Sequence, residues 1–108
     1  MKKMIVISAM LMASPACAMT GAQFVQAPKA IAVGYAQGVV DYVTTVGSGD
    51  QEIKRIMDIR SCFASSKISN DTFYSSIMAH IQNNPENLPN SAVGSVLQVI
   101  EKMCPDKR

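Results

Sequence analysis

The chain has 108 residues, a length that supports a single domain, and its ten basic residues nearly balance its eight acidic ones. The two extra basic residues, Lys2 and Lys3, lie at the N-terminus. No cluster of Lys and Arg remains that would indicate binding to nucleic acid or to an anionic membrane. The longest apolar run, residues 4–13, is about half the roughly 20 residues that a membrane-spanning helix requires, so a membrane span is not expected.

The first 18 residues have the layout of a secretory signal peptide. Two lysines precede the apolar run, and a small-residue segment that includes Ala16 and Ala18 follows it. Signal peptidases accept small residues at the first and third positions before the cleaved bond, so we expect cleavage between Ala18 and Met19. This cleavage leaves 90 of the 108 residues as a periplasmic domain with eight basic and eight acidic residues.

Cys17 offers an alternative in which the mature N-terminus is lipidated. A lipobox requires Leu three residues before the cysteine, and this chain has Ser14 there, followed by Pro15. We therefore expect Cys17 to be removed with the signal peptide.

Residues 19–27 lack a clear periodicity and are predicted to form a flexible arm. A helix is predicted over residues 28–46, because Pro28 suits a first helical turn and apolar residues follow at three- and four-residue steps. The apolar stripe consists of Ile31, Tyr35, Val39, Tyr42 and Val46.

Gly34 and Gly38 stand four residues apart in this helix, where each glycine costs about 1 kcal/mol relative to alanine. We expect a neighbouring helix to approach closely at these glycines, and a contact between copies of the chain is the alternative. A membrane dimerisation motif is disfavoured, because Gln37 and Asp41 interrupt the apolar surroundings that it needs.

A second helix is predicted over residues 51–60, with Asp50 as its N-cap and an apolar repeat of Ile53, Ile56 and Met57. An ordered loop is the alternative there. Residues 62–67, which begin with Cys62, have no clear period.

Two more helices are predicted, over residues 70–82 and 90–103, separated by the turn-rich segment 83–89. Ser69 is a good N-cap for the first of them. The expected core residues are Phe73, Ile77 and Ile81 in one helix and Val93, Val96, Leu97 and Ile100 in the other. The predicted fold is therefore all-α, a small four-helix bundle.

Two cysteines, Cys62 and Cys104, remain after cleavage, and an even pair in a short exported chain predicts a disulfide. Closing a loop of about 43 residues would stabilise the domain by about 4 kcal/mol in the chain-entropy model. Two free thiols or an intermolecular pair are the alternatives. We expect this bond to hold both sides of the turn at residues 83–89.

No constellation of residues predicts catalysis, a cofactor or a metal site. The single histidine, His80, has no carboxylate or cysteine three or four residues away, so it is interpreted as a partly exposed or hydrogen-bonded helix residue. The acidic residues near position 52 alternate with basic ones, as on a solvated helix face. We therefore expect a protein that is not an enzyme.

Binding to another protein would be carried by an exposed loop on a rigid scaffold. The turn-rich segment is the best candidate because it is long enough to protrude, rich in amides and stiffened by prolines. A helix connection with no partner is the alternative. The candidate binding residues are Asn83, Asn84, Pro85, Glu86, Asn87 and Leu88.

The order of several short motifs resembles one known family. These motifs are Gly34, Tyr35, Gly38, Val39, Val40 and Asp41, then Cys62 a few residues before Ser69, then Asn84, Pro85 and Glu86, then Ala92, and then Cys104. In this order they resemble the Rap/Tai family of periplasmic immunity proteins, which protect bacteria against peptidoglycan amidase toxins delivered by type VI secretion.

The resemblance implies a helical domain, often a homodimer, that blocks the cleft of a cognate amidase effector with a protruding loop. By position, this role would fall to the segment 83–89. The alternatives are an acid-stress periplasmic chaperone of the HdeA type, although this chain has fewer charges than those proteins, and another periplasmic protein-binding module.

Overall fold

The structure of the protein is a computed structural model that describes residues 19–106. Within these residues the regular elements are α1 (Gly21–Gln26), α2 (Lys29–Val43), α3 (Asp50–Ser65), α4 (Asn70–Asn83), the 3-10 helix η1 (Pro85–Asn87) and α5 (Ala92–Met103). The predicted all-α class is confirmed, whereas a four-helix bundle is not. The predicted signal peptide and Cys17 lie outside the described residues. Among the described helices, none has the length and apolar character needed to cross a membrane.

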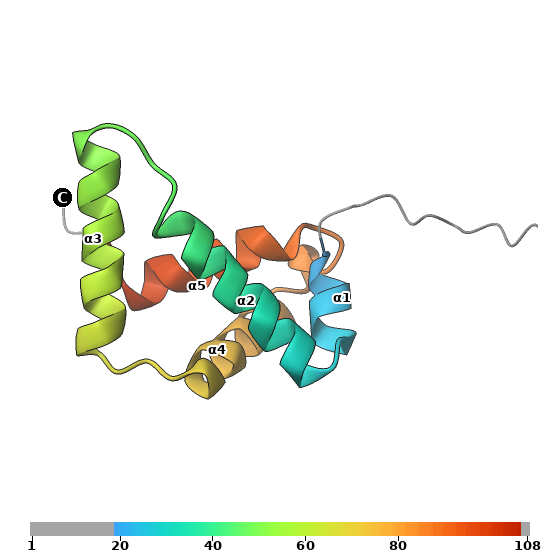
Figure 1. The fold of residues 1–108 in the computed structure, drawn as a ribbon. Helices are drawn as coiled ribbons and strands as arrows, with labels where there is room; N and C mark the ends of the chain where they lie inside the picture. Colours follow the sequence, from blue (N-terminus) through green and yellow to red (C-terminus); the bar gives the residue numbers. More distant parts are fainter. Residues whose placement is uncertain (1–18, 107–108) are drawn as a thin grey trace, which may run out of the picture.

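The core forms where α2, α4 and α5 meet, with α1 at one end of the group and α3 set off at the other (Figure 1). Three predicted core residues of α4, Phe73, Ile77 and Ile81, are all buried. Ser69 caps this helix as predicted, because its hydroxyl oxygen accepts the backbone N–H of Thr72. The buried residues of α5 are Ala92, Ser95, Val96, Val99 and Ile100.

The prediction of a flexible arm at residues 19–27 is wrong, because this segment contains α1. A capping box begins the helix: the Thr20 hydroxyl accepts the Gln23 N–H, and the Gln23 side chain accepts the Thr20 N–H. Phe24 is fully buried, with its ring centroid 6.2 Å from that of Tyr35 and 6.0 Å from that of Tyr74. Local capping and one buried aromatic ring therefore order a segment too short to show periodicity.

The apolar stripe predicted for α2 is also wrong in part. The residues that α2 buries are Ala32, Ala36 and Val39, whereas Ile31 and Tyr42 are 56% and 64% exposed. Small side chains face α4 and α5 and let those helices approach closely. The helix ends at Val43, so the predicted last turn up to Val46 is not helical.

The two α2 glycines do not lie against a neighbouring helix. A Cβ atom added at Gly34 or Gly38 would meet no atom within 4 Å, so both positions face open space in the described chain. The predicted close approach within the domain is therefore wrong. Contact with another molecule remains the alternative for this surface.

Helix α3 is longer than predicted and has little core of its own. It begins after Gly49, whose φ of 95° lies in the left-handed region, so Asp50 is the first helical residue instead of the cap. Among its residues only Ile59 is buried. Cys62 lies inside its last turns, not in an irregular stretch, and there it forms the predicted disulfide with Cys104.

Two arginines also connect α3 to the rest of the domain. Arg55 Nη2 donates to Glu101 Oε2 at 2.6 Å and to the Cys104 carbonyl at 2.7 Å, and Arg60 Nη2 donates to the Thr44 carbonyl at 2.5 Å. One disulfide and these polar contacts thus supplement the single buried side chain that α3 supplies.

Candidate functional site

The segment predicted to bind a partner forms a compact corner between α4 and α5. Asn84 ends α4, and its Nδ2 atom donates to the His80 carbonyl at 2.8 Å. Short backbone hydrogen bonds then turn the chain: Asn87 N–H donates to the Asn84 carbonyl at 2.8 Å, and Leu88 N–H to the Pro85 carbonyl at 3.1 Å. We call residues 83–90 the α4–α5 corner.

The first described residues lie against this corner and cover one side of it. Gly21 N–H donates to the Asn90 carbonyl at 2.8 Å, and Ala22 N–H donates to the Leu88 carbonyl at 2.9 Å. Ala92 N–H in turn donates to the Met19 carbonyl at 2.7 Å. We call residues 19–22 the N-terminal strap, which the sequence analysis missed.

Gly21 makes the contact between strap and corner close. It is buried, and a Cβ atom added to it would stand 2.6 Å from the carbonyl oxygen of Asn87. Only a residue without a side chain allows the two backbones to approach this far.

The six candidate binding residues divide into an outer and an inner group. Asn83, Pro85 and Glu86 are exposed, whereas Asn84, Asn87 and Leu88 are half-buried. The corner is therefore less protruding than predicted, and Leu88 packs against the core instead of facing a partner. Pro89 and Asn90 extend the exposed surface beyond the predicted set.

The disulfide does not hold the two sides of the corner, and this prediction is wrong. Cys104 follows the last residue of α5, while the corner precedes its first residue. The 12 residues of α5 at 1.5 Å each place the two features about 18 Å apart along the helix. The N-terminal strap, not the disulfide, holds the corner in place.

Tyr35 lies beneath the start of α5, close to the strap. Burial raises the pKa of its hydroxyl, and the Ser91 side chain and the Val93 backbone offset this rise in part. The hydroxyl is nevertheless without a hydrogen bond of good geometry. Burial of a hydroxyl without a hydrogen-bond partner favours the neutral form of tyrosine.

His80 is hydrogen-bonded, as interpreted from the sequence. Its Nε2 atom lies 2.5 Å from Gln98 Oε1, and its Nδ1 atom lies 3.3 Å from Lys102 Nζ. Because an ammonium group only donates, Nδ1 acts as the acceptor toward Lys102 and Nε2 carries the proton toward Gln98. This contact joins the exposed sides of α4 and α5.

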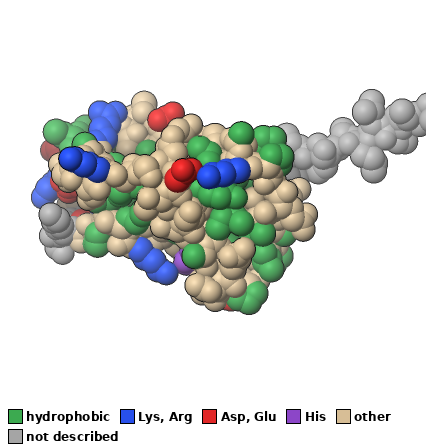
Figure 2. Space-filling model, turned by 90° about the horizontal axis from the view of Figure 1, so that it is seen from below, with side chains coloured by type: hydrophobic (Ala, Val, Ile, Leu, Met, Phe, Trp, Pro, Cys, Tyr) green, Lys and Arg blue, Asp and Glu red, His purple; other side chains and the backbone are tan. Residues whose placement is uncertain are grey.

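The described surface does not collect charge of one sign on the face shown in Figure 2, where basic and acidic side chains are dispersed. Between residues 19 and 106, no group of three or more His, Cys, Asp or Glu side chains could hold a metal ion. The most distinctive feature of this surface is the α4–α5 corner, which is held by backbone hydrogen bonds and carries the exposed carboxylate of Glu86.

Comparisons with models of protein families, with characterised proteins and with solved structures gave no match to this chain. The function is therefore argued from the residues and their arrangement.

Proposed function

We propose that the protein is an exported immunity protein that binds and inhibits a cognate peptidoglycan amidase delivered by type VI secretion. The order of the motifs around Asp41, Glu86 and Cys104 supports this assignment, and so does the signal-peptide layout of residues 1–18. Under this proposal the protein acts in the periplasm as a binding protein without catalytic activity. The family resemblance also implies that it can form a homodimer.

The observation that carries the proposal is the network of backbone hydrogen bonds that fixes the α4–α5 corner. Backbone hydrogen bonds connect the corner to the end of α4 and to the strap, while Pro85 and Glu86 face solvent. A loop already fixed in one conformation loses little conformational entropy when it binds. Such a loop suits insertion into an enzyme cleft.

The chemistry of the outer corner suits a polar cleft. Glu86 supplies a carboxylate and Asn83 supplies an amide, and both side chains are exposed. A carboxylate accepts charge-assisted hydrogen bonds from backbone N–H groups or basic side chains, which are about twice as strong as neutral ones. Glu86 is therefore the expected centre of the contact.

The proposal predicts that a neighbouring gene encodes the cognate amidase, and a binding measurement with that amidase tests it. We expect the unaltered protein to inhibit peptidoglycan hydrolysis by that amidase and to form a stable complex with it. Glu86→Ala combined with Asn83→Ala should weaken binding at least tenfold, because central contacts contribute about 1–2 kcal/mol or more each. Lys54→Ala, on the exposed side of α3, is the control and should bind normally.

Circular dichroism distinguishes lost binding from lost folding. The double variant must keep the helical signal and melting temperature of the unaltered protein for its affinity to be interpreted. Unchanged inhibition by a folded double variant would remove the corner from the interface. Absence of any complex with the amidase would overturn the proposal itself.

An acid-stress chaperone is the second candidate, and the loose attachment of α3 favours it. Ile53 and Met57 are exposed on α3, and the helix buries only Ile59. Release of α3 at low pH would expose more apolar surface to client proteins. Suppression of client aggregation at about pH 3, where carboxylates become protonated, would favour this function over inhibition of an amidase.

A further inference from the structure

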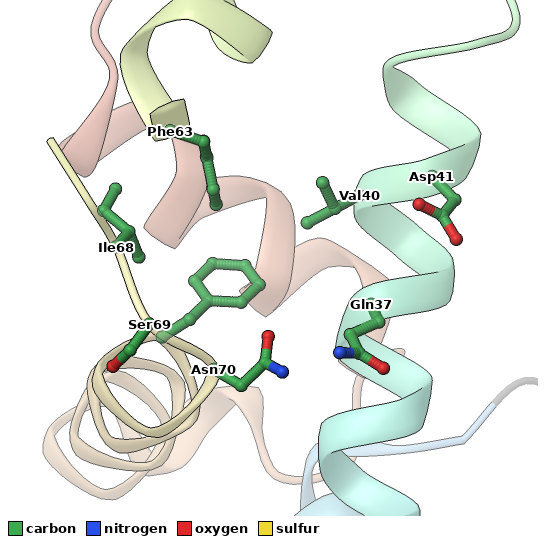
Figure 3. Close-up of a pocket in the computed structure, with 8 residues that line it drawn as sticks. Gln37, Val40, Asp41, Phe63, Ile68, Ser69 and Asn70 are labelled. Carbon is green, nitrogen blue, oxygen red and sulfur yellow. The ribbon is translucent and has the colours of Figure 1, made fainter. Parts of the chain in front are cut away.

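A cavity of about 330 Å³ opens between α2, the end of α3 and the start of α4 (Figure 3). This volume lies in the range of ligand pockets, roughly 300–1,000 Å³. The residues that line it are Gln37, Val40, Asp41, Phe63, Ile68, Ser69, Asn70 and Phe73. It lies apart from the α4–α5 corner, because it is formed at the opposite end of α4.

The interior of the cavity is apolar and partly aromatic. Phe63 and Phe73 meet edge to face, with ring centroids 5.4 Å apart. Val40 points from α2 toward Phe63 (Figure 3). Ile68 completes this apolar surface on the α4 side. A flexible hydrocarbon chain would therefore find contacts on several sides.

The opening of the cavity is polar and carries a negative charge. Figure 3 shows the Gln37 and Asn70 side chains pointing toward one another, with Asp41 one turn from Gln37 along α2. Asp41 is exposed and makes no ion pair with any residue between 19 and 106. Its carboxylate is thus available to a charged group from outside.

The charge distribution favours a cation over an anion. Asp41 would repel an anion directly, and the Ser69 oxygen that caps the positive end of α4 already accepts the Thr72 N–H at 3.1 Å. Asp71, in the first turn of α4, is paired with Lys29 at 2.9 Å. The unpaired charge at the opening is therefore negative.

We propose that this cavity binds one Lys or Arg side chain of a protein partner. The methylene groups of that side chain lie against Phe63 and Phe73, and its charged end pairs with Asp41. The side-chain oxygens of Gln37 and Asn70 accept its remaining hydrogen bonds. The inference rests on the proposed function only in that the partner is a protein, and it does not depend on which protein binds the corner.

Titration of the ¹⁵N-labelled protein with small probes tests the cavity without any toxin. The probes are the Nα-acetyl methylamides of arginine and lysine, compared with those of norleucine and glutamate. We expect saturable chemical-shift changes for arginine and lysine at the backbone amides of residues 37–41 and 63–73. Norleucine, which has the apolar stem without the charge, should bind more weakly, and glutamate should not bind.

The matched variants are Asp41→Asn and Asp50→Asn, which each remove one exposed carboxylate. Asp41→Asn should weaken arginine binding roughly fivefold, as expected for loss of a partly desolvated ion pair, and Asp50→Asn should not. Equal binding of norleucine and arginine, stronger binding of glutamate, or no saturable shift would each overturn the proposal.

The outcome is independent of the test of the α4–α5 corner. If the protein inhibits the amidase but does not bind the arginine probe, the proposal for the cavity is rejected and the proposed function stands. Arginine binding in a protein that fails to bind the amidase would support the cavity and reject the amidase as partner.

Discussion

The contact between the N-terminal strap and the α4–α5 corner predicts opposite effects of the same substitution at two glycines. In Gly21→Ala, the new Cβ atom would stand 2.6 Å from the Asn87 carbonyl oxygen. Favourable contact needs about 3.5 Å, so strap and corner must separate by nearly 1 Å. Because the obstacle is backbone, no side-chain rotation can relieve the clash.

Separation weakens the two backbone hydrogen bonds from Gly21 and Ala22, at 2.8 and 2.9 Å. Overpacking of this kind costs about 1–3 kcal/mol, and each hydrogen bond contributes about 1 kcal/mol. The higher helix propensity of alanine offsets up to about 1 kcal/mol of this loss of stability. We expect Gly21→Ala to lower the free energy of unfolding by about 2 kcal/mol, which corresponds to roughly 10 °C in melting temperature.

Gly94→Ala is the matched control, since a Cβ atom at this helical position meets nothing within 4 Å. It should raise the free energy of unfolding by about 0.5–1 kcal/mol. Urea unfolding followed by circular dichroism at 222 nm measures both variants. A Gly21→Ala variant as stable as the unaltered protein would refute the strap as a close backbone contact.

Three further predictions concern stability. Gly34→Ala with Gly38→Ala should raise the melting temperature, because both glycines face open space and each gains about 0.5–1 kcal/mol; a fall would show that a partner surface or another conformation occupies this face. Tyr35→Phe should reduce the loss of stability above about pH 10, measured by urea unfolding at several pH values. The raised pKa in the folded state makes ionisation of Tyr35 favour unfolding there, so an unchanged pH profile would contradict the burial of its hydroxyl. Cys104→Ser should cost about 2–5 kcal/mol, and hydrogen exchange should be fastest in α3; uniform exchange across the helices would contradict its weak attachment.

Helix α4 could be predicted well because its signals are local and agree with one another. Ser69 caps it, and Phe73, Ile77 and Ile81 repeat at four-residue steps on one face, all of them buried in the structure. The disulfide was also predictable, because removal of Cys17 with the expected signal peptide leaves two cysteines and thus one intramolecular pairing. For α4 and the disulfide, the residues that the local sequence pattern predicts to be buried or paired are those that the tertiary structure buries or pairs.

The buried face of α2 could not be predicted in the same way. Two stripes fit the helical period: one contains Ile31 and Tyr42, and the other contains Ala32 and Ala36. The larger side chains made the first stripe look like the core, but the alanines are buried at 0% and 2% exposure. Which of the two stripes is buried depends on how closely α4 and α5 approach α2. The sequence of α2 alone does not determine that distance.

The N-terminal strap shows the limit of local reasoning about the candidate site. The signal for α1 was present, because Thr20 and Gln23 have capping-box spacing just before Phe24. Its contact with residues 87–92, however, joins segments almost 70 positions apart. No local pattern indicates such a pairing, so the corner was interpreted as a free loop.

Loss of the disulfide should affect only one of the two proposed binding surfaces, which are the α4–α5 corner and the cavity. The corner lies at the start of α5 and is held by the strap, whereas Cys104 lies about 18 Å away at the other end. The cavity, in contrast, depends on Phe63, the residue next to Cys62 in α3. Release of α3 by Cys104→Ser should therefore abolish binding of the arginine probe and leave binding at the corner intact in the folded fraction. Loss of both activities together would mean that α3 positions the corner as well, through the core that α4 and α5 share.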